Sequence, residues 1–255
     1  MSELMKQYGG LASLAGVSLP GGGDSSKAAL AMELMKSRAF LGEFIERHDI
    51  LPELMAAESW DETTGEVRFD DDLYDVESGT WVRDVDPPKQ SKPSLQEAHE
   101  AFIEILGVSE EKDTGFVTVS VEHLSPMIAQ QWVTWLVDDI NQAVRDQDVA
   151  EANRSIDYLK EQVATTALAE LQSVFFELIQ SQTETVMLAQ VRPEYVFKTI
   201  DPAVVPEEKS KPKRALICVL GALLSGMLGV LVVLVRHYAL TREEVGSRQG
   251  EVGTV

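Results

Sequence analysis

The sequence ALICVLGALLSGMLGVLVVLV at residues 215–235 determines how the chain is organised. It contains no charged residue and no Asn, Gln or Pro, and its polar members are Cys218 and Ser225. As an α-helix it would span about 30 Å, the thickness of the hydrocarbon core of a bilayer. A core helix would need a domain around it, whereas the following residues, 236–255, are polar and contain glycine. We therefore expect a transmembrane helix over 215–235 and a short tail over 236–255.

Small residues recur on this predicted helix at helical spacing. They form two small-xxx-small pairs, Ala222 with Gly226 and Ser225 with Gly229, and Gly221 lies beside them. Such pairs allow the backbone of a second helix to approach closely. The segment therefore predicts a packing site for another membrane helix, from a neighbouring subunit, from the same protein or from a different membrane protein.

Acidic residues dominate the part of the chain before this segment. Residues 1–208 contain 39 Asp and Glu against 15 Lys and Arg, and the whole chain has a formal net charge of −20. A surface of this charge repels nucleic acid and anionic lipid headgroups, so we expect no nucleic-acid partner. Cys218 is the only cysteine, so no disulfide holds the fold. The Lys and Arg residues on the two sides of 215–235 are too evenly distributed to give its orientation.

Helix and strand signals alternate along residues 1–200. We expect helices over 25–48 and 94–106, the second beginning with a capping box of Ser94 and Glu97. Residues 49–88 are acidic and contain Trp60, Tyr74 and Trp81, which we expect to anchor a long irregular excursion. Residues 116–121 (FVTVSV) predict a strand, and residues 195–200 (YVFKTI) predict a second one.

A stretch of 66 residues, 127–192, contains neither Gly nor Pro. Ser125 and Pro126 before it form a strong helix start, with Ser as the N-cap and Pro at the first helical position. One continuous helix would be about 100 Å long, and the polar residues 145–153 or the pair at 165–166 could instead form a bend or a hairpin. Either form predicts long protruding helices, over about 125–192, that pack on further copies of the chain.

The predicted fold is therefore α+β: a small α/β base beside a membrane, with long protruding helices and a C-terminal transmembrane helix. Residues 1–200 form the domain outside the membrane. A proline-rich connector, 201–214, joins it to the membrane segment, and its marked residues are Pro202, Pro206, Pro212, Lys213 and Arg214. Proline excludes helix here and leaves an extended, stiff connection.

Signatures of catalysis are weak. The glycine-rich turn at 19–24 lacks the Gly-Lys-Ser/Thr ending of a phosphate loop, and the three aspartates at 70–72 lack the spacing of an EF-hand. The four histidines, His48, His99, His123 and His237, form no metal-ligand pair. We expect no catalytic residue, cofactor or metal, a dipole-stabilised His48 at a helix end, and a structural hydrogen bond for His123.

Several motifs nonetheless occur in a recognisable order: GLASLAG at 10–16, Leu51-Pro52, Trp60-Asp61, Trp81, TVSVEHLSP at 118–126 with Ala129, Trp132 and Asn141, then Asp201-Pro202-Ala203, Pro206, Pro212-Lys213-Arg214 and the glycines at 221, 226 and 229. In this order they resemble the chain-length determinant (Wzz-type) proteins, which are polysaccharide co-polymerases of bacterial inner membranes. The resemblance covers nearly the whole chain.

This resemblance implies a regulator that is not an enzyme. Members of the family form homo-oligomeric rings whose α+β base lies at the periplasmic face of the inner membrane. They set the modal length of O-antigen or a related lipid-linked glycan made by a membrane polymerase. The family has two membrane helices with both termini cytoplasmic, which implies that residues 236–255 form a short cytoplasmic tail. The first of these helices is absent from this sequence, so we expect a fragment or a truncated gene product.

Two alternatives stay open. The first is a polysaccharide export adaptor that works with a separate tyrosine kinase, the role of a related branch of proteins. The second is a membrane-anchored enzyme, although the sequence contains no nucleophile elbow.

Overall fold

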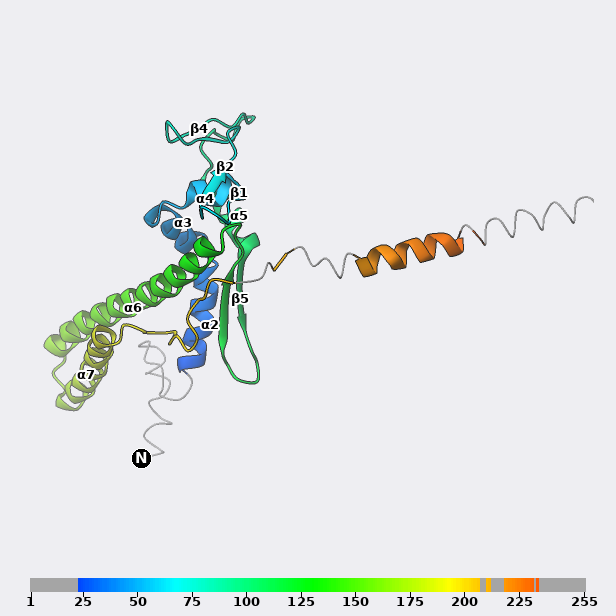
Figure 1. Cartoon of the computed structure of the whole chain (residues 1–255). Helices are drawn as coiled ribbons and strands as arrows, with labels where there is room; N and C mark the ends of the chain where they lie inside the picture. Colours follow the sequence, from blue (N-terminus) through cyan, green and yellow to red (C-terminus); the bar gives the residue numbers. More distant parts are fainter. Residues whose placement is uncertain (1–22, 207–209, 212–217, 232, 234–255) are drawn as a thin grey trace, which may run out of the picture. The chain divides into compact units, whose positions relative to one another are not determined.

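The computed structural model describes residues 23–206, 210–211, 218–231 and 233 of the 255-residue chain. The chain divides into two units, Met1–Val205 and Pro206–Val255. The first unit mixes helices with short antiparallel strands, which confirms the predicted α+β class (Figure 1). In the second unit, residues 218–231 and 233 are helical.

Two helices occupy the region where one was predicted. α2 covers Gly23–Met35 and α3 covers Arg38–Arg47, so the prediction of a single helix over 25–48 is wrong at its centre. The reason is Ser37, whose backbone is extended and whose hydroxyl accepts a hydrogen bond from the Phe40 N–H at 3.2 Å. Serine at such a position begins a new helix instead of continuing the old one. A short helix, α4 (Leu51–Met55), follows.

The acidic excursion contains two small two-stranded sheets, more regular structure than was predicted. β1 (Ala57–Trp60) pairs with β2 (Val67–Phe69), and β3 (Tyr74–Asp75) pairs with β4 (Thr80–Trp81), all antiparallel. The rings of Tyr74 and Trp81 lie across the second pair with centroids 5.1 Å apart. Trp81 also packs against the main core, which confirms its predicted anchoring role.

The next helix and strand agree with the sequence. α5 covers Leu95–Ile105, and both hydrogen bonds of the capping box between Ser94 and Glu97 are present. The predicted strand is β6 (Val117–Val121). Its antiparallel partner, β5 (Leu106–Glu110), was not predicted, and the register places Gly107 opposite Ser120. A Cβ on Gly107 would lie 2.4 Å from the Ser120 hydroxyl oxygen, so a larger residue here would require that hydroxyl to move.

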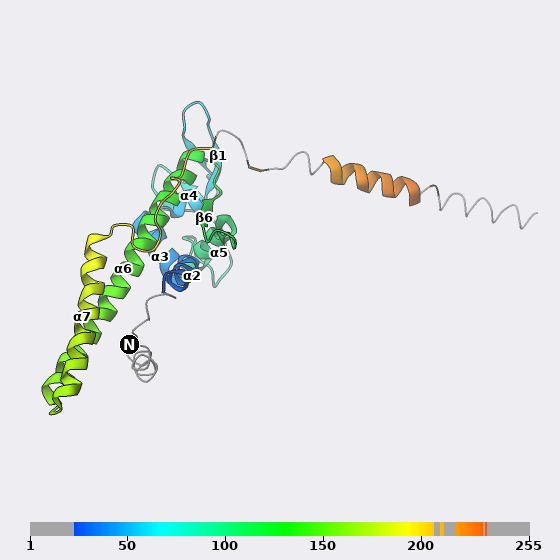
Figure 2. The same cartoon turned by 90° about the horizontal axis from the view of Figure 1, so that it is seen from below.

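The long Gly- and Pro-free stretch forms a helical hairpin. α6 covers Pro126–Thr165, 40 residues or about 60 Å, and starts at the predicted N-cap Ser125. α7 covers Ala169–Val191 and packs back along the distal part of α6 (Figures 1 and 2). Of the two predicted weak points, the one at 165–166 is where the chain turns, while α6 runs through 145–153 without a break.

The core of the first unit forms around the proximal half of α6. Trp132, Leu136, Ile140 and Val144 follow one another at four-residue steps and are buried, which places them on one face of the helix. They pack against the apolar faces of α2, α3 and α5, and the other buried members of this cluster are Ala31, Met35, Phe40, Leu41, Phe44, Ile45, Ile50, Leu51, Ala98 and Phe102. This core fixes the proximal half of α6, and the distal half pairs with α7.

The prediction of a strand over 195–200 is wrong. No strand pairs with these residues in the described part of the chain. The N–H groups of Val196 and Phe197 instead donate to the side-chain oxygen of Asn141, at 2.8 and 2.9 Å. An α6 side chain thus supplies the acceptor that a neighbouring strand would supply.

Among the described residues, no helix is both long and apolar enough to cross a membrane. Residues 215–217, 232, 234 and 235 of the predicted membrane segment lie outside those residues.

Candidate functional site

The α6–α7 hairpin extends beyond the main core, which contains no residue of α7 and no α6 residue after Val144. Its inner side is apolar: α7 turns Phe175, Ile179, Val186 and Ala189 inward, half-buried or buried, at spacings that keep them on one face. The turn is closed by Gln172, whose amide donates to the carbonyl oxygens of Thr166 at 2.8 Å and Val163 at 3.3 Å. These bonds satisfy carbonyl groups at the end of α6 that have no partner within the helix.

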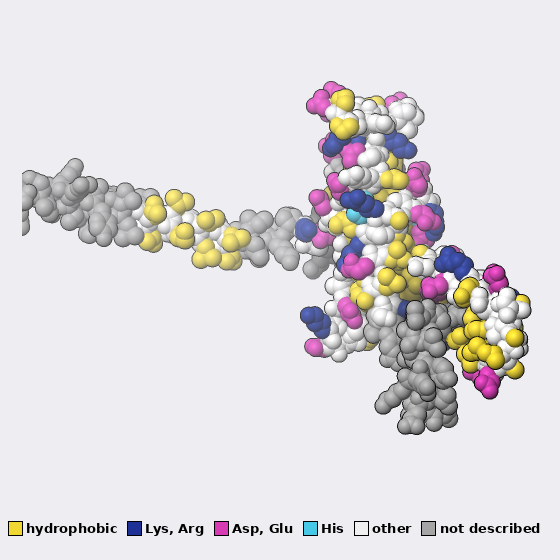
Figure 3. Space-filling model, turned by 180° about the vertical axis from the view of Figure 1, so that it is seen from behind, with side chains coloured by type: hydrophobic (Ala, Val, Ile, Leu, Met, Phe, Trp, Pro, Cys, Tyr) yellow, Lys and Arg dark blue, Asp and Glu magenta, His cyan; other side chains and the backbone are white. Residues whose placement is uncertain are grey.

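The outer side of the hairpin also carries large apolar side chains. We call this set the hairpin apolar surface, and its exposed members are Tyr158, Leu168, Leu171, Val174, Phe176, Met187, Leu188 and Val191. Figure 3 shows hydrophobic side chains gathered over α7. Phe176 and Met187 are 59% and 60% exposed, and α7 contains no Lys or Arg. Exposed apolar surface of this kind is typical of protein interaction sites.

After α7 the chain returns along α6 as an extended segment, residues 194–203, which we call the strap. The side chain of Asn141, itself buried, accepts from two strap N–H groups and donates to the Phe197 carbonyl oxygen at 3.0 Å. The Gln130 amide donates to the Ala203 carbonyl oxygen at 3.1 Å. The strap is therefore held by polar side chains of α6 and not by a sheet.

Asp148 joins three elements near the start of the strap. Its carboxylate accepts hydrogen bonds from the Tyr195 hydroxyl and from the Lys27 ammonium of α2, both at 2.7 Å. The Lys27 nitrogen also lies 5.5 Å from the centre of the Tyr195 ring. Burial, and then the neighbouring Asp148 carboxylate, raise the pKa of the Tyr195 hydroxyl well above its usual range, so it stays a proton donor at physiological pH.

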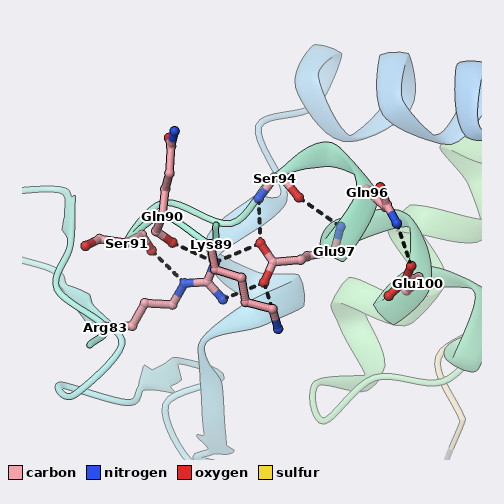
Figure 4. Close-up of polar contacts among 8 residues, drawn as sticks. All are labelled: Arg83, Lys89, Gln90, Ser91, Ser94, Gln96, Glu97 and Glu100. Carbon is pink, nitrogen blue, oxygen red and sulfur yellow. Dashed lines mark hydrogen bonds and ion pairs between the residues drawn. The ribbon is translucent and has the colours of Figure 1, made fainter. Parts of the chain in front are cut away.

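A charged cluster holds the acidic excursion to the N-terminus of α5 (Figure 4). The two terminal nitrogens of Arg83 donate to the two carboxylate oxygens of Glu97 at 3.1 and 2.9 Å, and Arg83 also donates to the carbonyl oxygens of Gln90 and Ser91. The hydrogen bonds from Arg83 and then from the Ser94 N–H lower the pKa of Glu97 to about 2. This cluster is structural, because every group in it is paired within the chain.

The Glu97 cluster predicts a loss of stability in acid. The carboxyl has an ordinary pKa of 4.5, lowered to about 2 in the folded chain, so its contribution is complete above pH 4.5 and is lost as the pH falls toward 2. We expect Glu97→Gln to destabilise the fold by about 1–2 kcal/mol at pH 7. Urea unfolding at several pH values should show this difference shrinking below pH 4.5.

Glu100→Gln is the matched control, because Glu100 lies one turn further along α5 and accepts a side-chain hydrogen bond from Gln96, on the same helix. Its difference from the parent chain should be small at every pH. A Glu97→Gln difference that stayed constant between pH 7 and pH 3 would contradict the assignment.

The three histidines among the described residues, His48, His99 and His123, have structural partners. The His123 Nε2 donates to the Glu53 carbonyl oxygen at 3.1 Å, and its Nδ1 accepts from the Ser125 N–H, which confirms the predicted hydrogen-bonding role. His48 lies at the end of α3 as predicted, with its Nε2 3.0 Å from the Asp139 carboxylate and its ring stacked on Trp135. In the described ranges, no group of three or more His, Cys, Asp or Glu side chains is arranged to hold a metal ion.

The five small residues of the predicted membrane helix are among the described residues. Gly221, Ala222, Ser225, Gly226 and Gly229 lie in the helical run 218–231, and the Ser225 hydroxyl donates to the Ala222 carbonyl oxygen at 3.0 Å, the self-bonding expected for such a helix. Their role in helix packing stays a prediction.

The connector is described at Pro202 and Pro206, where the chain is neither helix nor strand. Pro212, Lys213 and Arg214 lie outside the described residues.

Sequence reasoning missed the polar side chains that hold the strap. Asn141 was noted only as part of a motif, and Asp148 and Gln130 were not singled out. Their spacings of 7 and 11 residues place all three on one face of α6. This polar row on an otherwise half-buried helix was the available signal.

Comparison with known families bears on the second half of the chain. Residues 169–238 match the family described as GNVR, the G-rich domain on putative tyrosine kinase. The match begins at α7 and continues through the strap, the connector and the glycine-bearing apolar segment. No curated protein matches the sequence. The G-rich domain is found in chain-length determinant and tyrosine-kinase proteins of the Wzz and Wzc type, so the match relates residues 169–238 to the polysaccharide chain-length and export machinery.

Proposed function

We propose that this chain regulates the modal length of O-antigen or a related lipid-linked glycan, as an oligomeric co-polymerase of the bacterial inner membrane. The observation that carries the proposal is the G-rich domain match, which begins at α7 of the hairpin and extends across the apolar segment. In this role the chain makes no covalent bond. It assembles with copies of itself beside a polysaccharide polymerase, and most of the chain lies in the periplasm.

The hairpin supports self-assembly. The apolar inner side of the hairpin is buried where α7 packs on α6. The hairpin apolar surface stays exposed and is available for a further partner. Burying a side chain of the size of Phe or Met contributes about 1.5–3 kcal/mol, and several such side chains lie along α7. Copies arranged around a ring would bury them and would present repeated acidic surfaces to a growing glycan.

Residues 215–235 provide the anchor in this proposal. Their length and apolarity suit a bilayer, and the small residues at 222, 225, 226 and 229 suit close contact with another membrane helix. The polymerase and a neighbouring subunit are the proposed partners of that contact.

The glycan ladder provides the test. In a strain that lacks the gene, a double variant Phe176→Glu/Met187→Glu should fail to restore the parental length distribution, while polymer is still made, because assembly is lost and polymerisation is not. The measurement is the lipopolysaccharide ladder on a gel. A complete loss of polymer would indicate catalysis, and a parental ladder would contradict the role of the hairpin.

An export adaptor that works with a separate tyrosine kinase is the second candidate. The description of the matched domain, which names a putative tyrosine kinase, favours it. This role predicts that deleting the gene lowers surface polysaccharide and tyrosine phosphorylation of a partner protein, with no change in the length of the polymer that is still made. Immunoblotting for phosphotyrosine beside the glycan ladder distinguishes the two.

A further inference from the structure

We propose that the strap is a releasable element and that the Asp148 carboxylate couples its release to α2. This inference concerns the first unit alone and does not depend on the glycan role proposed above. Three anchor points on α6 define the docked state: Asp148 for the Tyr195 hydroxyl, Asn141 for the backbone of Val196 and Phe197, and Gln130 for the Ala203 carbonyl.

The chemistry of these anchors permits release without unfolding. Each is a hydrogen bond between an α6 side chain and the strap, and water can replace the strap as the partner of a side chain that release uncovers. Between the anchors the strap is loosely packed, since Ile200 is 72% exposed. Release would separate only the half-buried Tyr195, Val196 and Phe197 from the edge of the core. Segments that bury little apolar surface open at lower free energy than the core does.

Coupling arises because α2 and the strap bind the same carboxylate. The Lys27 ammonium bonds to Asp148 and lies over the Tyr195 ring, while the Tyr195 hydroxyl bonds to Asp148. When the strap leaves, Lys27 loses the ring and Asp148 loses one of its two donors. Asp148 holds Lys27 over the Tyr195 ring, and this contact exists only while the strap is docked. The contact therefore stabilises the docked strap and the attachment of α2 together, and such coupling is reciprocal.

The arrangement links two separate parts of the chain. α2 follows residues 1–22, and the strap continues into Pro206 and the second unit. A partner that restrains the chain before α2 would therefore tighten the strap through Asp148, and a partner that pulls on the strap would weaken the attachment of α2. Asp148 acts as a positioning residue between them.

Hydrogen exchange on the full chain in detergent tests the release. The amides of Val196 and Phe197 should exchange at least tenfold faster than the buried α6 amides of Leu136 and Ile140. Asn141→Ala should accelerate the strap amides by about a further tenfold and leave the core amides unchanged. Gln142→Ala, at the exposed neighbouring position, is the control and should change neither. Strap amides that exchange at the same rate as the core would overturn the proposal.

A double-mutant cycle tests the coupling. Lys27→Met and Tyr195→Ala, which removes both the ring and the hydroxyl, should each accelerate exchange of the strap amides several-fold, and their combined effect should be smaller than the product of the two. Lys36→Met, at the end of α2, removes the same charge away from Asp148 and should leave the strap amides unchanged. Effects that multiply, or an Lys27→Met chain whose strap exchanges at the parental rate, would refute the coupling.

Discussion

Trp132→Ala will lower the free energy of unfolding of the first unit by about 3–5 kcal/mol. Trp132 is 2% exposed and occupies the centre of the core. Its ring stacks on Phe102, with centroids 5.6 Å apart, and its other neighbour is the His123 ring at 4.9 Å. Truncation removes the packing against α5 and against the junction before α6 together, and the cavity cannot collapse without moving α6.

Urea or thermal unfolding measures this loss, and Gln131→Ala, an exposed neighbour on the same helix, should change stability by less than about 0.5 kcal/mol. Because a folded domain has only about 5–15 kcal/mol in total, the Trp132→Ala chain should be partly unfolded at moderate temperature. A loss below about 1 kcal/mol would show that the core is not organised around this ring.

The second large effect concerns assembly. Under the proposed role, Phe176→Glu/Met187→Glu should raise the dissociation constant for self-association more than about 100-fold, because two exposed apolar side chains contribute about 3–6 kcal/mol when buried between subunits. The folded monomer should keep its stability, since both side chains are already exposed. Analytical ultracentrifugation of the full chain in detergent measures the change.

A matched double variant, Ser173→Glu/Gln190→Glu, adds the same charge to exposed polar positions of α7. Both positions lie one turn from Phe176 and Met187 and keep those side chains. This variant therefore separates the effect of charge from the removal of apolar surface, and it should weaken self-association less than Phe176→Glu/Met187→Glu does. A parent chain that sediments as a monomer would contradict the assembly proposal itself.

Local signals predicted the beginnings of elements well. Ser94 with Glu97 and Ser125 with Pro126 each mark a helix start, because their capping bonds lie within one turn of chain and depend on nothing else. The strand over 117–121 followed from its β-branched residues. Its partner β5 was missed because it begins directly at the end of α5 and contains Gly107, a residue type that is rare in strands.

Long-range partners could not be predicted in the same way. Residues 195–200 have the composition of a strand, yet their hydrogen bonds go to Asn141, 55 and 56 positions earlier in the chain. Asp148 likewise joins Lys27, 121 positions away, to Tyr195. No periodicity in a sequence reports such pairs. The prediction of one helix over 25–48 was wrong for a local reason. The cap at Ser37 begins a second helix, although the apolar pattern continues through this position.

The rigidity of α6 has a mechanical consequence. Val144 is the last α6 residue in the main core, and about 20 residues, or roughly 30 Å of helix, extend beyond it. If α6 tilts by about 5° at Val144, the far end of the helix moves by roughly 3 Å, a distance comparable to the length of one hydrogen bond. Small adjustments in the packing around Trp132 are therefore amplified at the distal turn, and in the proposed assembly they would set the spacing between the tips of neighbouring hairpins.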